Sequence, residues 1–281
     1  MCTTAYIKSA FDGIRTDNTS GSGALLAKLI DRLSGCHNVP YAWSENESAD
    51  IYGLFSLFRN EMSDFAVITH FCNFMIGCIR EKKVKDTDTF LQFVKRYSDE
   101  WKDVNDRIAE NFIAKFSLKG KTVLLHSHSS AIISLFEKVR EDAGNINIIQ
   151  TESRPVYEGR LQAKRLAGQG YKIRLVTDTG FTPLLDDIDY AILGADRIYN
   201  DFFINKAGSY AIALLCREKS VPLYVLADSR KILNTNLPAG YKEKMRPARE
   251  VWNSPPSGIT PINYYFEAVP VDLITRLITE K

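Results

Sequence analysis

The sequence predicts the α/β fold class, with an N-terminal helical domain followed by a Rossmann-like parallel-sheet domain. Up to about residue 118, the apolar segments either have helical spacing, clearest at residues 87–116, or lack strand-like alternation. From residue 119 onward, short apolar runs alternate with helical pattern, as in the βα units of a parallel sheet. We therefore expect a helical domain at residues 1–118 and a Rossmann-like domain with a ligand cleft at residues 119–281.

The apolar pattern of the first domain indicates helices throughout. The predicted helical segments are residues 24–33, 51–58, 65–79 and 87–116. The last segment has the clearest helical period, and Asp86 or Thr87 could cap its first turn. Its stripe of aromatic and aliphatic side chains is interpreted as packing against neighbouring helices.

Five short runs rich in Val, Ile and Leu predict the strands of the second domain. The runs span residues 122–125, 146–149, 173–176, 190–193 and 223–226. Helical pattern between them predicts helices at residues 130–141, 158–169 and 208–219. Strands buried on both faces appear in a sequence as continuous apolar runs, so the sheet is expected to be parallel.

Composition narrows the classes of function. The chain has 281 residues, is 45% hydrophobic and carries a net charge of +2, which argues against a nucleic-acid partner. It contains no apolar stretch long enough for a membrane span and no secretory signal, and its five cysteines form no C-x-x-C pair. The scattered histidines, and the lack of a G-x-G-x-x-G after a strand or of a P-loop, predict neither metal nor cofactor. We expect a cytoplasmic protein with free, buried thiols.

Polar residues follow each of the five predicted strands. They are His126, Ser127 and His128; Glu152, Ser153 and Arg154; Asp178 and Thr179; Asp196 and Arg197; and Asp228 and Ser229. Ligands of open α/β sheets bind beyond the carboxyl ends of the strands. One such residue would be explained equally well as a helix cap or loop end, but five strand ends in a row favour a shared site.

The residue types at these strand ends suit a phosphorylated, hydroxyl-rich ligand. Ser129-Ser130 opens a predicted helix, whose first N–H groups could bind a phosphate. Arg154 could hold a phosphate in a bidentate manner, and Asn205-Lys206 adds an amide and a cation. The neighbouring aspartates, Asp178 among them, repel one another unless a polyol or a cation relieves the repulsion. A sugar phosphate has both kinds of group.

Five ordered motifs carry a resemblance to a known superfamily. They are KTVLLHSHSS (121–130), TESRPVYEGR (151–160), GADRIYNDFFINKAGSYAIAL (194–214), VPLYVLADSRKI (221–232) and FEAVPVDLITRLITE (266–280). The chain resembles the superfamily of the alpha, beta and delta subunits of translation initiation factor 2B, methylthioribose-1-phosphate isomerase and ribose-1,5-bisphosphate isomerase. The motifs cover nearly all of the second domain in the family's order.

The resemblance implies roles for four of the residues above. Asp196 matches the catalytic aspartate of the isomerases, Asn205 and Lys206 match their substrate-holding pair, and Arg154 matches a pocket-lining position. The isomerases of this superfamily interconvert aldose and ketose phosphates without a metal or nicotinamide. Members associate through the C-terminal domain, so the resemblance implies a homo-oligomer.

Two departures from the isomerase pattern bear on catalysis. Ser127 stands where the isomerases have a catalytic cysteine, and a serine hydroxyl does not ionise near neutral pH. Either His126 or His128 could supply the missing proton transfer, or the site could bind without turnover. The run Gly21-Ser22-Gly23 replaces the arginine-containing phosphate loop of the isomerases, and is either a phosphate nest or the start of a helix.

Two hypotheses of function follow. The first is a protein that binds a phosphorylated sugar or a related small molecule, with aldose–ketose isomerisation by Asp196 and a strand-end histidine left open. The alternative is a non-catalytic regulatory or assembly subunit of the initiation factor 2B type. The strand-end residues 126–128 distinguish the two, because they lack the isomerase cysteine.

Overall fold

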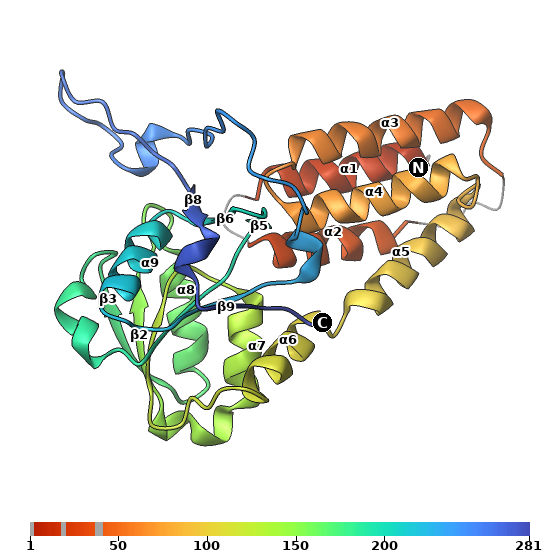
Figure 1. Cartoon of the computed structure of the whole chain (residues 1–281). Coiled ribbons are helices and arrows are strands. Elements are labelled where there is room, and N and C mark those ends of the chain that lie inside the picture. The colour runs from red at the N-terminus through yellow and green to blue at the C-terminus, as the bar shows by residue number, and fades with distance from the viewer. Residues whose placement is uncertain (1–2, 18–20, 37–41) are drawn as a thin grey trace. The chain divides into compact units, whose positions relative to one another are not determined.

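The computed structural model describes residues 3–17, 21–36 and 42–281. The chain divides into two compact units, Met1–Asp103 and Val104–Lys281 (Figure 1). The sequence prediction set the domain change at residue 118. The structure groups α6 (Val104–Ile113) with the second unit, because this helix packs along α7 (Ser130–Lys138).

Five helices form the described part of the first unit. They are α1 (Thr3–Arg15), α2 (Ser22–Ser34), α3 (Glu45–Glu61), α4 (Ala66–Arg80) and α5 (Thr87–Trp101). Their buried faces meet in an aromatic core, in which the Phe11 ring stacks on Phe58 at 4.1 Å and meets Phe55 edge-on at 5.1 Å. Asp86 caps α5 as predicted, since its side chain accepts from the Thr89 N–H at 2.7 Å.

The single helix predicted at residues 87–116 is wrong, because the structure has two helices there. Helix α5 ends at Trp101 and α6 begins at Val104. Each buries its apolar stripe in a different unit: Tyr97 lies in the core of the first, and Phe112 packs on Tyr224 in the second. The apolar period continues across the break, so the sequence pattern did not reveal it.

The second unit contains a sheet of six parallel strands in the order β3-β2-β1-β4-β7-β9. The strands are β1 (Thr122–Leu125), β2 (Asn147–Thr151), β3 (Lys172–Val176), β4 (Tyr190–Leu193), β7 (Leu223–Leu226) and β9 (Arg276–Ile278). The predicted α/β fold class is confirmed, and five of these strands were predicted. Helices α7, α8 (Glu158–Ala167) and α9 (Ser209–Glu218) connect the strands.

A second, antiparallel sheet was not predicted. It has the order β5-β6-β8, formed by Arg197–Ile198, Phe202–Lys206 and Phe266–Pro270. Phe203 of β6 and Val269 of β8 are buried in the same core as the large sheet. Strand β6 starts one short turn after Asp196 and ends at Lys206, so it places Asn205 and Lys206 among the strand ends.

A long excursion, residues 233–264, separates the last two parts of the second unit (blue in Figure 1). All of these residues are described, and the regular structure among them is one 3-10 turn, Ala248–Glu250, and one isolated bridge. Met245, Trp252 and Ile262 expose large apolar side chains here. Exposed apolar residues gathered on one segment are typical of an interaction surface.

Candidate functional site

The chain turns sharply where it leaves β1. Ser127 has a φ of +66°, in the left-handed region. Its N–H donates to the Ser153 hydroxyl at 2.8 Å, and its carbonyl accepts from the Gln150 amide at 3.3 Å. The Ser127 hydroxyl itself makes no hydrogen bond to any described residue. A left-handed residue interrupts strand alternation, so His126 and His128 have different surroundings.

His126 is fully enclosed by hydrogen-bonding partners. Its side chain is buried, with Nδ1 at 2.6 Å from the Thr151 hydroxyl and Nε2 at 2.9 Å from the Ala207 carbonyl. A carbonyl only accepts, so Nε2 carries the proton and Nδ1 accepts from Thr151. Burial lowers the pKa of His126 to about 4. The geometry therefore favours a neutral supporting role for His126 over the predicted proton transfer, which stays untested.

His128 is half-buried on the other side of the turn. Burial, and then the nearby Arg165 guanidinium of α8, lower the pKa of His128. Both effects disfavour the imidazolium form at neutral pH. Proton transfer by His128 stays a prediction.

Asp178 holds the loop that carries Arg154. Its two carboxylate oxygens accept from the Ser153 N–H at 2.6 Å and from the Arg154 N–H at 2.8 Å. A carboxylate that bonds to two backbone N–H groups fixes the path of the loop. The Arg154 side chain is exposed, with its guanidinium 5.5 Å from the Tyr157 ring. Asp178 thus positions Arg154, and contact of either residue with a ligand remains a prediction.

Lys206 forms a buried ion pair with a residue that the sequence analysis missed. The Lys206 side chain is 1% exposed, and its Nζ lies 2.9 Å from Oε1 of Glu158. Burial raises the pKa of the Glu158 carboxyl, the Lys206 ammonium opposes this shift, and the charge of Asp196 adds to it. Glu158, Asp196 and Lys206 therefore lie within electrostatic reach of one another.

The backbone around Asp196 is fixed on both sides. The Asp196 N–H donates to the Ile204 carbonyl at 2.8 Å, which joins the end of β4 to β6. The Lys231 ammonium donates to the Ala195 carbonyl at 2.6 Å. In the next turn, the Asn205 amide donates to the Ser209 hydroxyl at 2.8 Å. These bonds hold Asp196 just after β4, as predicted, and Asn205 within β6, which was not predicted.

Tyr265 covers Lys206 on another side. The Lys206 ammonium lies 4.9 Å from the centre of the Tyr265 ring, and the Arg246 guanidinium lies 5.0 Å from the same ring. The Tyr265 hydroxyl donates to Glu250 at 2.5 Å. Burial and this hydrogen bond raise the pKa of Tyr265, so it stays protonated. We call Glu158, Asp196, Lys206 and Tyr265 the strand-end cluster.

Two glycines let helices approach the strand ends closely. A Cβ on Gly159 would lie 1.9 Å from the Thr151 carbonyl oxygen, so α8 could not start here with a larger residue. Gly208 has a φ of +107°, and a Cβ there would lie 3.0 Å from the His126 ring. The Gly208 and Tyr210 N–H groups each donate to Glu267 at 2.7 Å, so a carboxylate already occupies the start of α9.

The glycine run predicted as a phosphate loop lies at the start of α2. Gly21 is the N-cap residue, Ser22 is buried and Gly23 is exposed. Of the two alternatives, the start of a helix describes what the structure shows. Phosphate binding by this run stays a prediction, since Gly21 belongs to the first unit and the other predicted site residues belong to the second.

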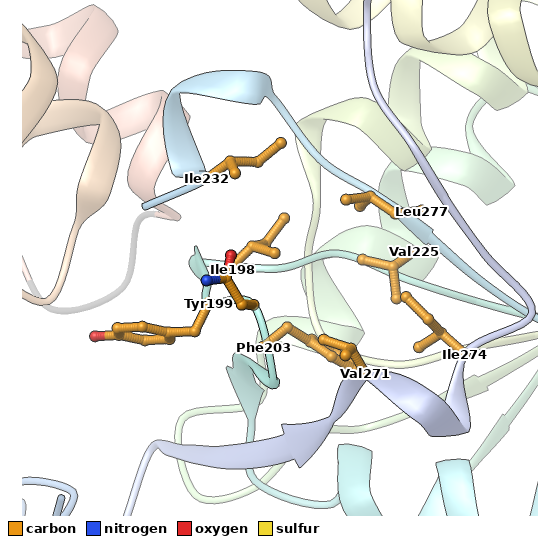
Figure 2. A pocket seen from close by; sticks show the side chains of 9 residues that line it. Ile198, Tyr199, Phe203, Val225, Ile232, Val271, Ile274 and Leu277 are labelled. Atoms are coloured by element: carbon orange, nitrogen blue, oxygen red, sulfur yellow. The ribbon is translucent and has the colours of Figure 1, made fainter. Parts of the chain in front are cut away.

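An apolar pocket of about 260 Å³ lies between the two sheets of the second unit (Figure 2). Ile198, Phe203, Val225, Ile232 and Leu277 are among the side chains that surround it. Among the residues that the structure describes, the lining contains none that is charged. It therefore does not suit a phosphate and is distinct from the strand-end cluster.

The described residues offer little support for a metal site, a membrane span or a reactive cysteine. No group of three or more His, Cys, Asp or Glu there could hold a metal ion. No described helix has both the length and the apolar character that crossing a bilayer requires. Burial raises the pKa of the Cys72 and Cys216 thiols to about 12, so neither can replace the missing isomerase cysteine.

Comparison with known proteins agrees with this architecture. Residues 65–281 match the model of the Initiation factor 2 subunit family. The chain belongs to this family. The predicted resemblance is therefore confirmed, and the matched residues contain the whole strand-end cluster.

One curated relative is a ribose 1,5-bisphosphate isomerase of Archaeoglobus fulgidus. It is 35% identical over 170 residues, which cover 57% of this chain and 53% of the relative. The chain spans about half the length of the curated relatives that it matches.

Two solved structures from Pyrococcus horikoshii share the fold. The translation initiation factor eIF-2B has a TM-score of 0.78 at 21% identity, covering 98% of this chain and 94% of the other. The 5-methylthioribose 1-phosphate isomerase has a TM-score of 0.77 at 20% identity, covering 98% and 83%. At this identity, the likeness concerns the fold alone.

Proposed function

We propose that the chain binds a phosphorylated sugar at the strand-end cluster. The observation that carries this proposal is the buried Lys206 ammonium, which lies beside Glu158 and within reach of Asp196 where the parallel strands end. The Lys206 ammonium is buried and the Glu158 and Asp196 side chains are partly buried, and such a grouping of charges is unfavourable for stability alone. Functional sites are where such groupings occur, and the ends of parallel strands are the usual place for ligands.

The two parts of the proposed ligand, its phosphate and its sugar hydroxyls, would contact different groups of the protein. Helix α7 starts at Ser130, and the Ser129 side chain makes no cap hydrogen bond among the described residues. The Ser129 N–H donates to Gln162 at 2.9 Å, so the N–H groups of the first turn after it are the ones that can bind a phosphate. Arg154 is exposed beside the same strand ends. The carboxylates of the cluster would accept hydrogen bonds from sugar hydroxyls. The curated relative named as a ribose 1,5-bisphosphate isomerase supports a ligand of this class.

A non-catalytic regulatory subunit of the initiation factor 2B type is the second candidate function. Ser127 stands in place of the isomerase cysteine, and His126 uses both ring nitrogens within the protein. An isomerase must move one hydrogen from C2 to C1 and another between their oxygens, so it needs groups that exchange protons at neutral pH. These two observations favour binding without turnover.

We further propose a cytoplasmic homo-oligomer that associates through the second unit. The exposed apolar side chains of residues 245–264 support an interface there. Light scattering of the purified chain would show the oligomer. Replacement of Trp252 and Ile262 by Ser would then shift it to the monomer, and an unchanged mass would exclude this interface.

A thermal-shift panel tests the binding proposal. It contains pentose mono- and bisphosphates and nucleoside monophosphates, with inorganic phosphate and unphosphorylated ribose as controls. We expect a sugar phosphate to raise the unfolding midpoint well above either control, because only the folded state binds it. No stabilisation by any phosphorylated sugar would overturn the proposal.

An isomerase assay on each stabilising compound then separates the two candidates. Binding without turnover, with turnover gained in Ser127→Cys, would identify a site that kept its geometry but lost its acid–base group. Turnover by the wild-type chain would favour the isomerase. If Asp196→Asn then left that activity intact, the catalytic role implied for Asp196 would be wrong.

A further inference from the structure

Glu158 has one carboxylate oxygen in use and one without a partner. Oε1 accepts from the Lys206 ammonium at 2.9 Å, whereas Oε2 is buried and bonds to no hydrogen-bond donor in the described chain. Buried polar atoms of folded proteins are nearly always hydrogen-bonded, and an exception points to an absent donor. The Glu158 side chain as a whole is 17% exposed, so the residue borders solvent beside this buried oxygen.

The position of Glu158 is imposed by the backbone. It is the first residue of α8, and Gly159 brings this helix against the Thr151 carbonyl, where any side chain would collide. Lys206 is held equally firmly, since it ends β6 and packs on the Tyr265 ring. The Lys206–Glu158 pair is therefore part of the framework and does not depend on surface rotamers.

The charges of the cluster determine which part of a ligand can lie beside Lys206. The one ammonium, Lys206, is paired with Glu158, the charge of Asp196 reaches Glu158, and the remaining member, Tyr265, stays protonated. The Lys206 charge is thus already offset by Glu158. A phosphate dianion placed here would meet the Glu158 carboxylate beside an ammonium that is already paired, whereas a sugar hydroxyl could donate to Oε2 of Glu158.

We infer that Glu158 determines ligand specificity, by accepting a sugar hydroxyl beside Lys206 and excluding a phosphate from that position. The ligand class is then a sugar monophosphate, with its one phosphate away from Lys206, and not a bisphosphate. This inference rests on the proposed binding of a phosphorylated sugar.

Isothermal titration calorimetry with three probes tests the inference. The probes are ribose 5-phosphate, ribose 1-phosphate and ribose 1,5-bisphosphate, each titrated into the wild-type chain, Glu158→Gln and Glu110→Gln. Glu110 is the matched control, because it is an exposed glutamate of α6 that pairs with Lys138 at 2.8 Å and is not among the strand-end residues. Circular dichroism confirms that each variant is folded.

We expect the wild-type chain to bind one monophosphate more tightly than the bisphosphate. Glu158→Gln removes one negative charge, so the ratio of bisphosphate to monophosphate affinity should rise by about tenfold or more. Glu110→Gln should leave this ratio unchanged.

The outcomes distinguish a failure of this inference from a failure of the proposed sugar-phosphate binding. If the wild-type chain binds the bisphosphate more tightly, or if Glu158→Gln does not change the ratio, the inference is wrong while sugar-phosphate binding stands. If the wild-type chain binds none of the three probes, the proposed function itself is overturned. The preference of the wild-type chain for a monophosphate over the bisphosphate is measured without any variant. It therefore tests the inference even if Glu158→Gln does not fold.

Discussion

The interior of the first unit consists of packed aromatic rings, whereas the strand ends of the second unit bury hydrogen-bonded polar side chains. Phe11, Phe55 and Phe58 have no exposed surface, and they contact other apolar side chains. His126 and Lys206 are buried as completely, at 1% exposure each. Packing accounts for the aromatic core, because it removes apolar area from water. It does not account for buried charge, and this difference is the reason for placing the proposed site in the second unit.

The largest expected loss of stability comes from a substitution in the aromatic core of the first unit. Phe55→Ala should lower the free energy of unfolding by about 3–5 kcal/mol, since it leaves a cavity in a close-packed core. Urea denaturation at pH 7 and pH 5 measures the loss, which should be the same at both. Leu57→Ala on the same helix is the control, because Leu57 is 53% exposed. An equal loss in both variants would contradict the packing argument.

The buried polar group His126 of the second unit should instead make the free energy of unfolding depend on pH. The pKa of His126 is lowered to about 4 in the folded chain, against about 6.5 when unfolded. Between these values the unfolded state binds more protons, so stability falls as pH falls from about 7 to 4. The total contribution is about 3 kcal/mol.

Nuclear magnetic resonance of the His126 ring protons would show a titration midpoint near pH 4. Urea denaturation would show a steeper loss of stability on acidification in the wild-type chain than in His126→Asn. A midpoint near 6.5 would mean that the ring is not enclosed as described.

Asp178→Asn, at the strand ends of the second unit, should lower the free energy of unfolding by a smaller amount. An amide oxygen can replace one carboxylate oxygen, but the amide NH₂ then faces a backbone N–H that had been hydrogen-bonded. We expect a loss of about 1–3 kcal/mol and weaker ligand binding through the displaced Arg154. Asp186→Asn is the control, because Asp186 pairs with Lys219 at an exposed site and should leave the unfolding midpoint unchanged.

The smallest predicted effect concerns a polar group of the first unit. Ser44 and Glu47 form a capping box at the start of α3. Ser44→Ala should cost about 1 kcal/mol in thermal or urea unfolding. Glu47→Gln should retain most of that stability, because glutamine also closes a capping box. A loss as large as that of Phe55→Ala would show that polar contacts matter as much in this unit as in the other.

Much of the fold was predictable, because its strands are apolar runs between turns. Strand β9 was missed because Arg276–Ile278 is too short to show a pattern. Strand β6 was missed because it ends in Asn205 and Lys206, which are uncommon in strand interiors. The break between α5 and α6 was missed because the apolar stripe passes through it.

Two members of the proposed site, Asp196 and Lys206, could be named from the sequence because a motif contains them. Glu158 was missed because an acidic residue in the first turn of a helix is common and needs no function. The available signal was Gly159, since a glycine just inside a helix indicates a close backbone approach. The tautomer of His126 depends on Thr151 and Ala207, partners that only the fold brings together.

The strand order of the large sheet has a consequence for how the second unit forms. The first strand along the chain, β1, lies inside the sheet, with β2 on one side and β4 on the other. Strands β2 and β3 extend one side in sequence order, and β4, β7 and β9 extend the other. A chain that emerges from the ribosome N-terminus first can therefore add each strand to an existing edge without inserting one between two others. The last strand to be added is β9, and the chain just after it is joined to α6, where the Asn111 amide donates to the Thr279 carbonyl at 2.9 Å.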